Sequence, residues 1–183
     1  VARGLRLEQS ENILALGLDL QGLADMTVLI KGQLPKPRIE LNGRLSRVVL
    51  GDQPSEDSVF KLNFLSDRME GSGQFLGSTL ITDFIYPYDD QAPFLFKMKA
   101  RKWDFTTAFS LVSKSARQLD FTTLVTADVK LEAPSGGFWN SSGQVKIDEF
   151  SIRKGGKQMA ADKPMLLNVR SGVINSDNFA ITS

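Results

Sequence analysis

The chain has 183 residues, of which 42% are hydrophobic, and it carries 22 Lys and Arg against 21 Asp and Glu. This balance, with the basic residues spread along the sequence rather than gathered in one patch, gives no electrostatic footprint for nucleic acid. The sequence contains neither His nor Cys, which excludes thiol nucleophiles, imidazole proton shuttles and the usual zinc sites. No apolar run approaches 18 residues, so no membrane-spanning helix is expected.

The length fits one domain, and we predict a single segment over residues 1–183. The sequence begins at Val1 with neither Met nor a basic-then-apolar leader, and residues 178–183 read as part of another strand. We therefore expect a fragment of a longer chain.

The first 50 residues alternate between apolar and polar positions, as expected for strands with one dry and one wet face. Even positions are apolar over residues 12–20 and again over 28–34, with a turn expected at Gly22–Asp25. Proline cannot donate to a ladder, so Pro35 and Pro37 end this run. The next strand changes phase after Ser46, and a polar loop is expected at Gly51–Ser58. The dry face of that strand carries Ile39, Leu41, Leu45, Val48 and Leu50.

Further strands are predicted between residues 58 and 101. The first alternates from Phe60 to Phe64, and the chain is expected to turn at Ser66–Gly73. A longer run of β-branched and aromatic residues covers Gln74–Tyr88, and another strand alternates from Phe94 to Ala100. The longer run places on one side Leu80, Thr82, Phe84 and Tyr86.

One segment has helical periodicity, because its apolar residues are spaced by three and four from Phe105 to Leu119. Asp104 is a suitable N-cap, and Trp103 before it could pack against Ala108. We predict one short helix near residues 104–118, with its apolar face against the open end of a curled sheet.

The clearest alternation runs from Thr123 to Arg153. A break at Pro134–Gly137 separates two strands, and the second changes phase at Asp148 and Glu149, as a β-bulge would require. Shorter alternating runs follow up to Ile181. In total the sequence predicts about ten to twelve strands with short turns, which is typical of an antiparallel all-β meander.

A weak internal repeat relates residues 12–100 to residues 120–183. Placing Gly43 on Gly143 aligns Leu50 with Phe150, and both copies change phase between those positions. The spacing is 100 residues, and the identity between the copies is low.

Several motifs that suggest catalysis or ligand binding are placed wrongly for it. Ser58 and Lys61 match a Ser-x-x-Lys motif, but on an alternating strand they face opposite ways. The glycines at 71–77 miss the dinucleotide spacing and precede a strand. The acidic pair at 89–90 reads as a solvated loop. We predict no catalytic residue, no metal site and no cofactor, and hence no enzyme.

The sequence also resembles the TamB (translocation and assembly module) and AsmA-like proteins of Gram-negative envelopes. The resemblance lies in glycine-and-leucine strand patterns, in the helix start Trp103–Phe109 leading into Leu124–Leu131, and in the stretch from Ser142 to Gly172. It implies an elongated, U-shaped β-sheet (a "β-taco") in the periplasm, with the parent protein anchored in the inner membrane by parts outside this fragment. It also implies a role in lipid transport between the membranes or in outer-membrane protein biogenesis.

On this interpretation the apolar stripe is a groove that binds phospholipid or other acyl-chain lipids. A second expected partner is an outer-membrane β-barrel assembly partner. The alternative is a closed β-barrel or sandwich that binds one lipid or acts as a structural interaction module. The predicted groove-lining residues are Leu62, Phe64, Phe94, Phe96, Met98, Val125, Ala127, Val129, Leu131, Val145, Ile147, Phe150, Ile152, Leu167 and Val169.

Overall fold

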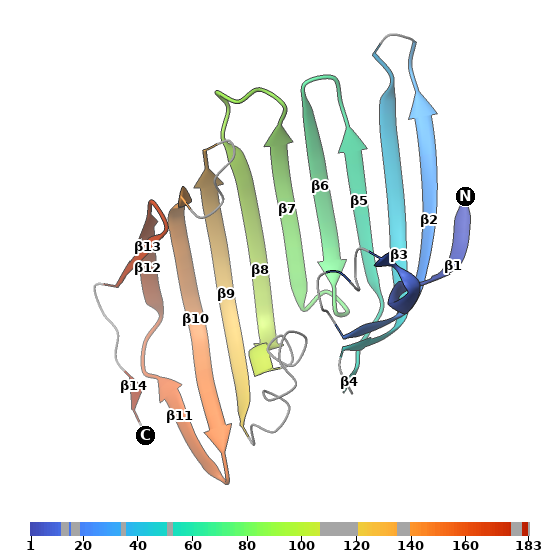
Figure 1. The fold of residues 1–183 in the computed structure, drawn as a ribbon. Coiled ribbons are helices and arrows are strands. Elements are labelled where there is room, and N and C mark those ends of the chain that lie inside the picture. The colour runs from blue at the N-terminus through green and yellow to red at the C-terminus, as the bar shows by residue number, and fades with distance from the viewer. Residues whose placement is uncertain are drawn as a thin grey trace.

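The computed structural model describes residues 1–11, 15, 19–33, 36–50, 53–106, 121–134, 140–176 and 181–182. In these residues fourteen strands form a single antiparallel sheet, which confirms the predicted all-β class (Figure 1). The elements are β1 (Ala2–Arg6), η1 (Leu7–Gln9), β2 (Leu20–Lys31), β3 (Arg38–Leu50), β4 (Gln53–Pro54), β5 (Ser58–Phe64), β6 (Arg68–Phe75), β7 (Leu80–Pro87), β8 (Phe94–Asp104), β9 (Thr122–Ala133), β10 (Ser142–Lys154), β11 (Lys157–Ala161), β12 (Met165–Arg170), β13 (Val173–Ser176) and β14 (Ile181–Thr182).

The sheet is a meander in which almost every strand pairs with its neighbour in sequence. Its order is β1-β2-β3-β5-β6-β7-β8-β9-β10-β11-β14, and β4 pairs with β3. Beyond β10 the sheet divides, because residues 143–147 of β10 pair with β12 whereas residues 151–154 pair with β11. No described strand joins β1 to the far end, so these strands form an open sheet rather than the closed barrel or sandwich of our alternative prediction.

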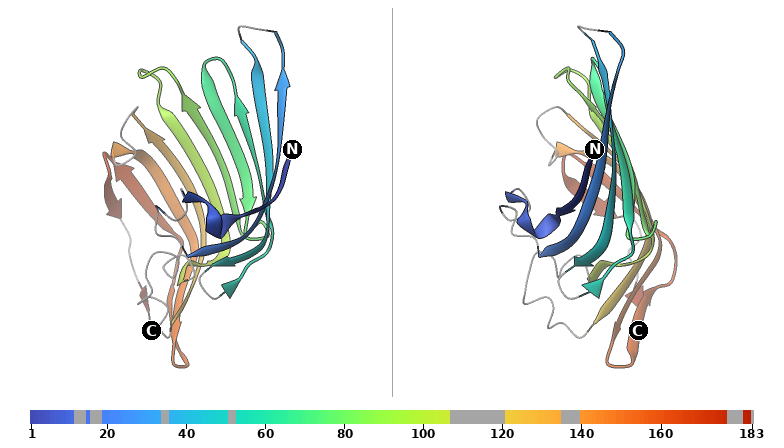
Figure 2. Two further views of the ribbon diagram at one scale, coloured as in Figure 1. Left: turned by 45° about the vertical axis from the view of Figure 1, so that its right-hand side comes forward. Right: turned by 90° about the vertical axis from the view of Figure 1, so that its right-hand side faces the viewer.

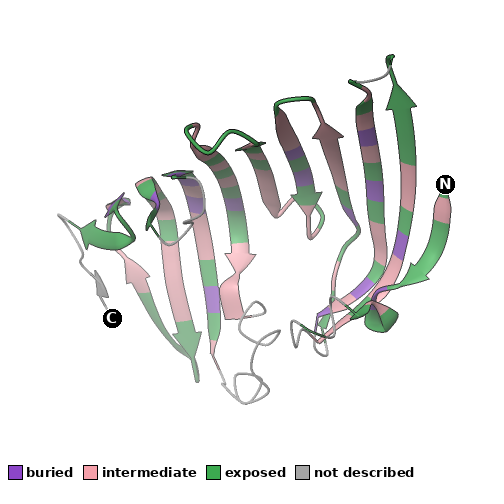
Figure 3. Ribbon diagram, turned by 45° about the horizontal axis from the view of Figure 1, so that its top comes forward, coloured by how far each residue is buried: buried purple, intermediate pink, exposed green. Residues whose placement is uncertain are grey.

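The sheet is curled, and bulges mark where its strands bend (Figures 2 and 3). The register shifts between Gln21 and Leu23 in the β2–β3 pair, and Arg47 of β3 has a positive φ. The β9–β10 register also shifts between Ile147 and Glu149. Both phase changes predicted from the sequence, after Ser46 and at Asp148–Glu149, are therefore confirmed as bulges, which keep the apolar side chains on one face.

The 3₁₀ helix η1 lies on the hollow side of the curl, near the start of β2 (Figure 2). It buries Leu7, and it lies against β2, in which Ala24 is also buried. Ala24 pairs with Leu45 on the dry side of β3, so we assign the apolar side of the sheet to the hollow side.

Two predicted turns are wrong because glycines were interpreted as turn signals. The chain continues through Gly22–Asp25 within β2, where Gly22 supports a bulge at a φ of 145°. At Ser66–Gly73 only the first residues turn, since β6 begins at Arg68 and includes two glycines covered by phenylalanine rings. The run Gln74–Tyr88 is also not one strand, because residues 76–79 form a turn between β6 and β7.

Two other predictions fall largely on residues outside the described ranges. Residues 12–14 and 16–18 of the first predicted strand lie there, and so do residues 107–118 of the predicted helix. At the expected start of that helix, the backbone N–H of Thr106 donates to Asp104 Oδ1 at 3.0 Å, as an N-cap would arrange. Trp103 packs edge-on against Phe105, with ring centroids 4.8 Å apart.

The internal repeat remains a prediction. Both aligned strands carry a bulge, but Gly43 lies in the middle of β3 opposite Met26, whereas Gly143 is the second residue of β10 and lies opposite Leu131.

Candidate functional site

All fifteen predicted groove residues project from the same side of the sheet. Side chains on directly paired residues share a face, and the registers connect these residues from β5 to β12. One row of partners crosses the sheet through Leu41, Leu62, Gly71, Phe84, Phe96, Leu131, Gly143 and Val169. A parallel row runs through Gly43, Phe60, Gly73, Thr82, Met98, Val129, Val145 and Leu167. We call this side of β2–β13 the apolar face.

On the apolar face of the described strands from β2 to β10, the only charged residue outside the bulges is Lys154, the last residue of β10. The uncharged polar members of the face there are Gln53 of β4 and hydroxyl groups such as those of Ser58, Thr82, Tyr86 and Thr123. Two of these hydroxyls have partners within the protein: Ser58 Oγ accepts from the Leu76 N–H at 3.0 Å, and Thr123 Oγ1 lies 3.1 Å from Thr106 Oγ1. The face therefore offers hydrocarbon a surface with few competing polar groups.

The apolar face is only half covered by the rest of the described chain. All nine described phenylalanines are half-buried, although phenylalanine is usually among the most buried residues. The fully buried positions are mostly small, as at Ala100, Ala127 and Ala133. In Figure 3 intermediate burial predominates along several of the central strands, with a few buried positions between.

The surface area agrees with an open shape. The chain exposes 12260 Å², whereas a compact monomer of 20.2 kDa is expected to expose about 8,800 Å².

Aromatic side chains cluster where β7 meets β8 on the apolar face. The ring of Phe94 lies 6.1 Å from those of Phe84 and Tyr86 and 6.4 Å from that of Phe96. At the rim beside this cluster, Tyr86, Tyr88 and Phe94 help to line a small cavity of about 230 Å³. Tyr86 is 47% exposed. It was absent from the predicted lining, although its alternation with Phe84 in the sequence was a sufficient signal.

The opposite side of the sheet is polar and carries the ion pairs. Lys31 Nζ donates to Glu40 Oε2 at 3.2 Å and lowers the pKa of that carboxyl. Arg44 donates to Asp57 at 2.6 Å, and Lys146 lies 2.6 Å from Asp148. These cross-strand and local pairs keep charges on the polar side of the sheet, away from the apolar face.

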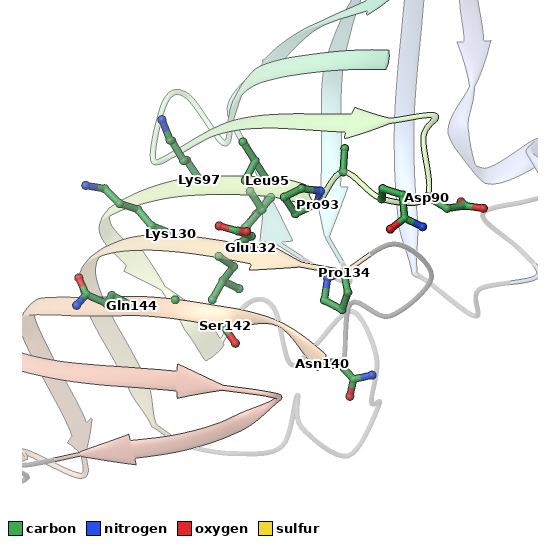
Figure 4. A pocket seen from close by; sticks show the side chains of 15 residues that line it. Asp90, Pro93, Leu95, Lys97, Lys130, Glu132, Pro134, Asn140, Ser142 and Gln144 are labelled. Atoms are coloured by element: carbon green, nitrogen blue, oxygen red, sulfur yellow. The ribbon is translucent and has the colours of Figure 1, made fainter. Parts of the chain in front are cut away.

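A cavity of about 910 Å³ also lies toward this polar side, at one end of β8, β9 and β10 (Figure 4). Lys97 and Lys130 line it as direct cross-strand partners, with Glu132 and Asp90 nearby. The two cations and two carboxylates balance, so the lining gives no preference for an anion. The sequence prediction did not include this cavity.

The catalytic motifs set aside in the sequence are separated in the structure as expected. Ser58 lies opposite Leu45 on the apolar face, and Lys61 lies opposite Asn42 on the polar side, so these two groups form no dyad. Among the described residues no cluster of three or more metal-ligating side chains occurs, and no helix is long and apolar enough to cross a bilayer.

Comparison with protein-family models, with curated proteins and with solved structures finds no match for this chain.

Proposed function

We propose that the chain is a segment of a periplasm-spanning, inner-membrane-anchored envelope protein of the TamB and AsmA-like kind, and that its apolar face carries phospholipid acyl chains between the membranes. The observation that supports this most directly is the continuous, almost uncharged and half-exposed apolar face of a curled sheet. Ordinary monomers rarely leave apolar patches beyond a few hundred Å² uncovered.

The physical basis is transfer of hydrocarbon out of water. Each buried methylene contributes about 0.8 kcal/mol, and an acyl chain needs no directional partner. The two central rows run across the strands from Leu41 to Val169 and from Phe60 to Leu167, and they consist of apolar side chains, glycines and the single hydroxyl residue Thr82. Neighbouring positions then bind a chain with similar free energy, so the chain can move from one strand to the next.

Photo-crosslinking from adjacent residues on opposite faces tests this function. The photoreactive residue p-benzoylphenylalanine is placed at Phe96 or Met98 on the apolar face of β8, and at Lys97 or Lys99 of the same strand as matched controls. Purified protein is illuminated with phosphatidylethanolamine vesicles, and lipid adducts are measured by mass spectrometry. We expect adducts from Phe96 and Met98 only. Equal labelling from both faces, or none, refutes the proposal.

A second candidate function, assistance to outer-membrane β-barrel proteins, is favoured by one edge of the sheet. β1 pairs with Leu23–Met26 of β2, so residues 27–31 have no described partner on that side. Val28, Leu29 and Ile30 there are exposed, Ile30 by 71%. A bare apolar edge is suited to strand addition.

Hydrogen exchange tests this second function. Adding an unfolded outer-membrane β-barrel protein should slow amide exchange at residues 27–31 and leave the interior strand β5 unchanged. Unaltered exchange at residues 27–31 contradicts it.

A further inference from the structure

Three glycines on the apolar face lie directly beneath phenylalanine rings. Gly43 is the cross-strand partner of Phe60, and Gly71 is the partner of Phe84. Gly73 precedes Phe75 by two residues on β6, so both project to the same side. At each glycine, an added Cβ would overlap the ring. Each ring therefore rests on glycine backbone, where a side chain would otherwise hold it away from the sheet.

These glycines occupy the two central rows of the apolar face. Gly71 lies in the row that passes through Leu62 and Phe84, and Gly43 and Gly73 lie in the next row, on either side of Phe60. The rings pack down at van der Waals distance, about 3.5–4 Å from the backbone. Across β3 to β7 the row through Gly43, Phe60 and Gly73 is consequently low. In the neighbouring row the larger side chains of Leu41 and Leu62 precede a second low position, where the Phe84 ring covers Gly71.

Seven other described glycines do not share this arrangement. A Cβ at Gly143 would meet the backbone oxygen of Lys130, and a Cβ at Gly155 or Gly156 would meet nothing within 4 Å. Ring-covered glycines are thus gathered on β3 and β6. An aromatic ring that covers a glycine stabilises a sheet wherever the pair occurs. That effect alone does not explain why the covered glycines lie in two adjacent rows of the apolar face.

We propose that Gly43, Gly71 and Gly73 determine which hydrocarbons the apolar face accepts. By holding Phe60, Phe84 and Phe75 flat, they keep a shallow lane across β3–β7 that fits one extended, unbranched acyl chain. A methyl-branched chain is too thick for this lane. The inference rests on the proposed lipid-carrying function and adds its specificity.

The test uses the Phe96 photo-crosslinker with Gly71→Ala, which pushes the Phe84 ring up into the lane. Labelling by phosphatidylethanolamine with straight acyl chains should fall about tenfold, equivalent to losing contact with about two methylene groups. Ser72→Ala, on the polar side of the same strand, should label like the parent protein. In Gly71→Ala/Phe84→Ala the displaced ring is absent, so labelling should recover.

A competition experiment on the unsubstituted lane keeps the proposal testable if Gly71→Ala does not fold. Palmitic acid should displace the crosslinked lipid at about tenfold lower concentration than phytanic acid, its methyl-branched counterpart. Equal competition by the two acids, or undiminished labelling of folded Gly71→Ala, overturns the inference and leaves the lipid-carrying function standing. Absence of any labelling from Phe96 in the parent protein removes the lipid-carrying function itself.

Discussion

Substitution of Val129 by Arg distinguishes an open apolar face from a sealed core. Val129 lies on the central strand β9, between Met98 and Val145, and is 9% exposed. A fully buried valine contributes about 1.5–3 kcal/mol. The aliphatic stem of an arginine replaces part of that contact, while its guanidinium extends past the half-covered face into water. We therefore expect Val129→Arg to lower the free energy of unfolding by about 1–2 kcal/mol.

The melting temperature measures this loss. For a chain of this length, about 1–2 kcal/mol corresponds to a decrease of about 2–8 °C, with the unfolding transition still cooperative. Lipid crosslinking at Phe96 should disappear, because the charge now lies across the central row. Lys130→Ala, at the adjacent position on the polar side, should change stability by less than about 0.5 kcal/mol and leave crosslinking intact.

The opposite result has a clear meaning. In a sealed core the same arginine is an uncompensated buried charge, which costs about 3–5 kcal/mol. A decrease in melting temperature well beyond 10 °C, or loss of the cooperative transition, would show that the lining packs against itself and would refute the open face.

Three further predictions concern acid stability, backbone strain and the exposed face. Because Lys31 lowers the pKa of Glu40 in the folded state, this carboxylate stabilises the fold above its unfolded pKa, and that contribution is lost as the pH falls through its folded pKa. Between about pH 6 and about pH 3, the melting temperature of Glu40→Gln should therefore decrease less than that of the parent protein. Gly143→Ala should destabilise by about 1–3 kcal/mol, and more than Gly155→Ala, since both have positive φ but only the former meets the Lys130 backbone; equal melting temperatures would contradict this. The folded protein should bind a hydrophobic dye at neutral pH and release it to phospholipid vesicles, whereas a native state that does not bind the dye argues against an exposed face.

The sequence was sufficient to place the predicted residues on one face of the sheet, because in each strand one of the two sets of alternate residues is almost wholly apolar. Alternation fixes the sides within a strand, as in Phe94, Phe96 and Met98, but it does not give the register between strands. The registers between strands have little effect on which face each side chain lies on. A sheet with one dry side must bring the apolar parity of every strand to that side, and the two bulges that restore parity at Arg47 and near Asp148 were visible as phase changes.

The wrong turn predictions came from glycine residues. Turns and strands both use it, and only tertiary contacts decide between them: Gly71 belongs to a strand because the Phe84 ring covers it from the neighbouring strand. For the same reason the sequence alone does not predict which glycines lie beneath phenylalanine rings, because the ring of Phe60 or Phe84 comes from a neighbouring strand. The cavity beside Lys97 and Lys130 likewise depends on register, since nothing in the two separate strands indicates that these lysines are partners.

The bulges also connect local sequence to the exposed face. They lie just beyond one cross-strand row, which runs through Leu45, Leu80, Ala100, Ala127 and Ile147. A bulge bends its strand and increases the local twist, so bulges aligned across β2, β3, β8 and β10 bend the sheet along a common line. A flat sheet would present its whole apolar side to water and to other copies of itself. The common bend instead turns that side inward and half covers it, which leaves room for hydrocarbon without exposing the face completely.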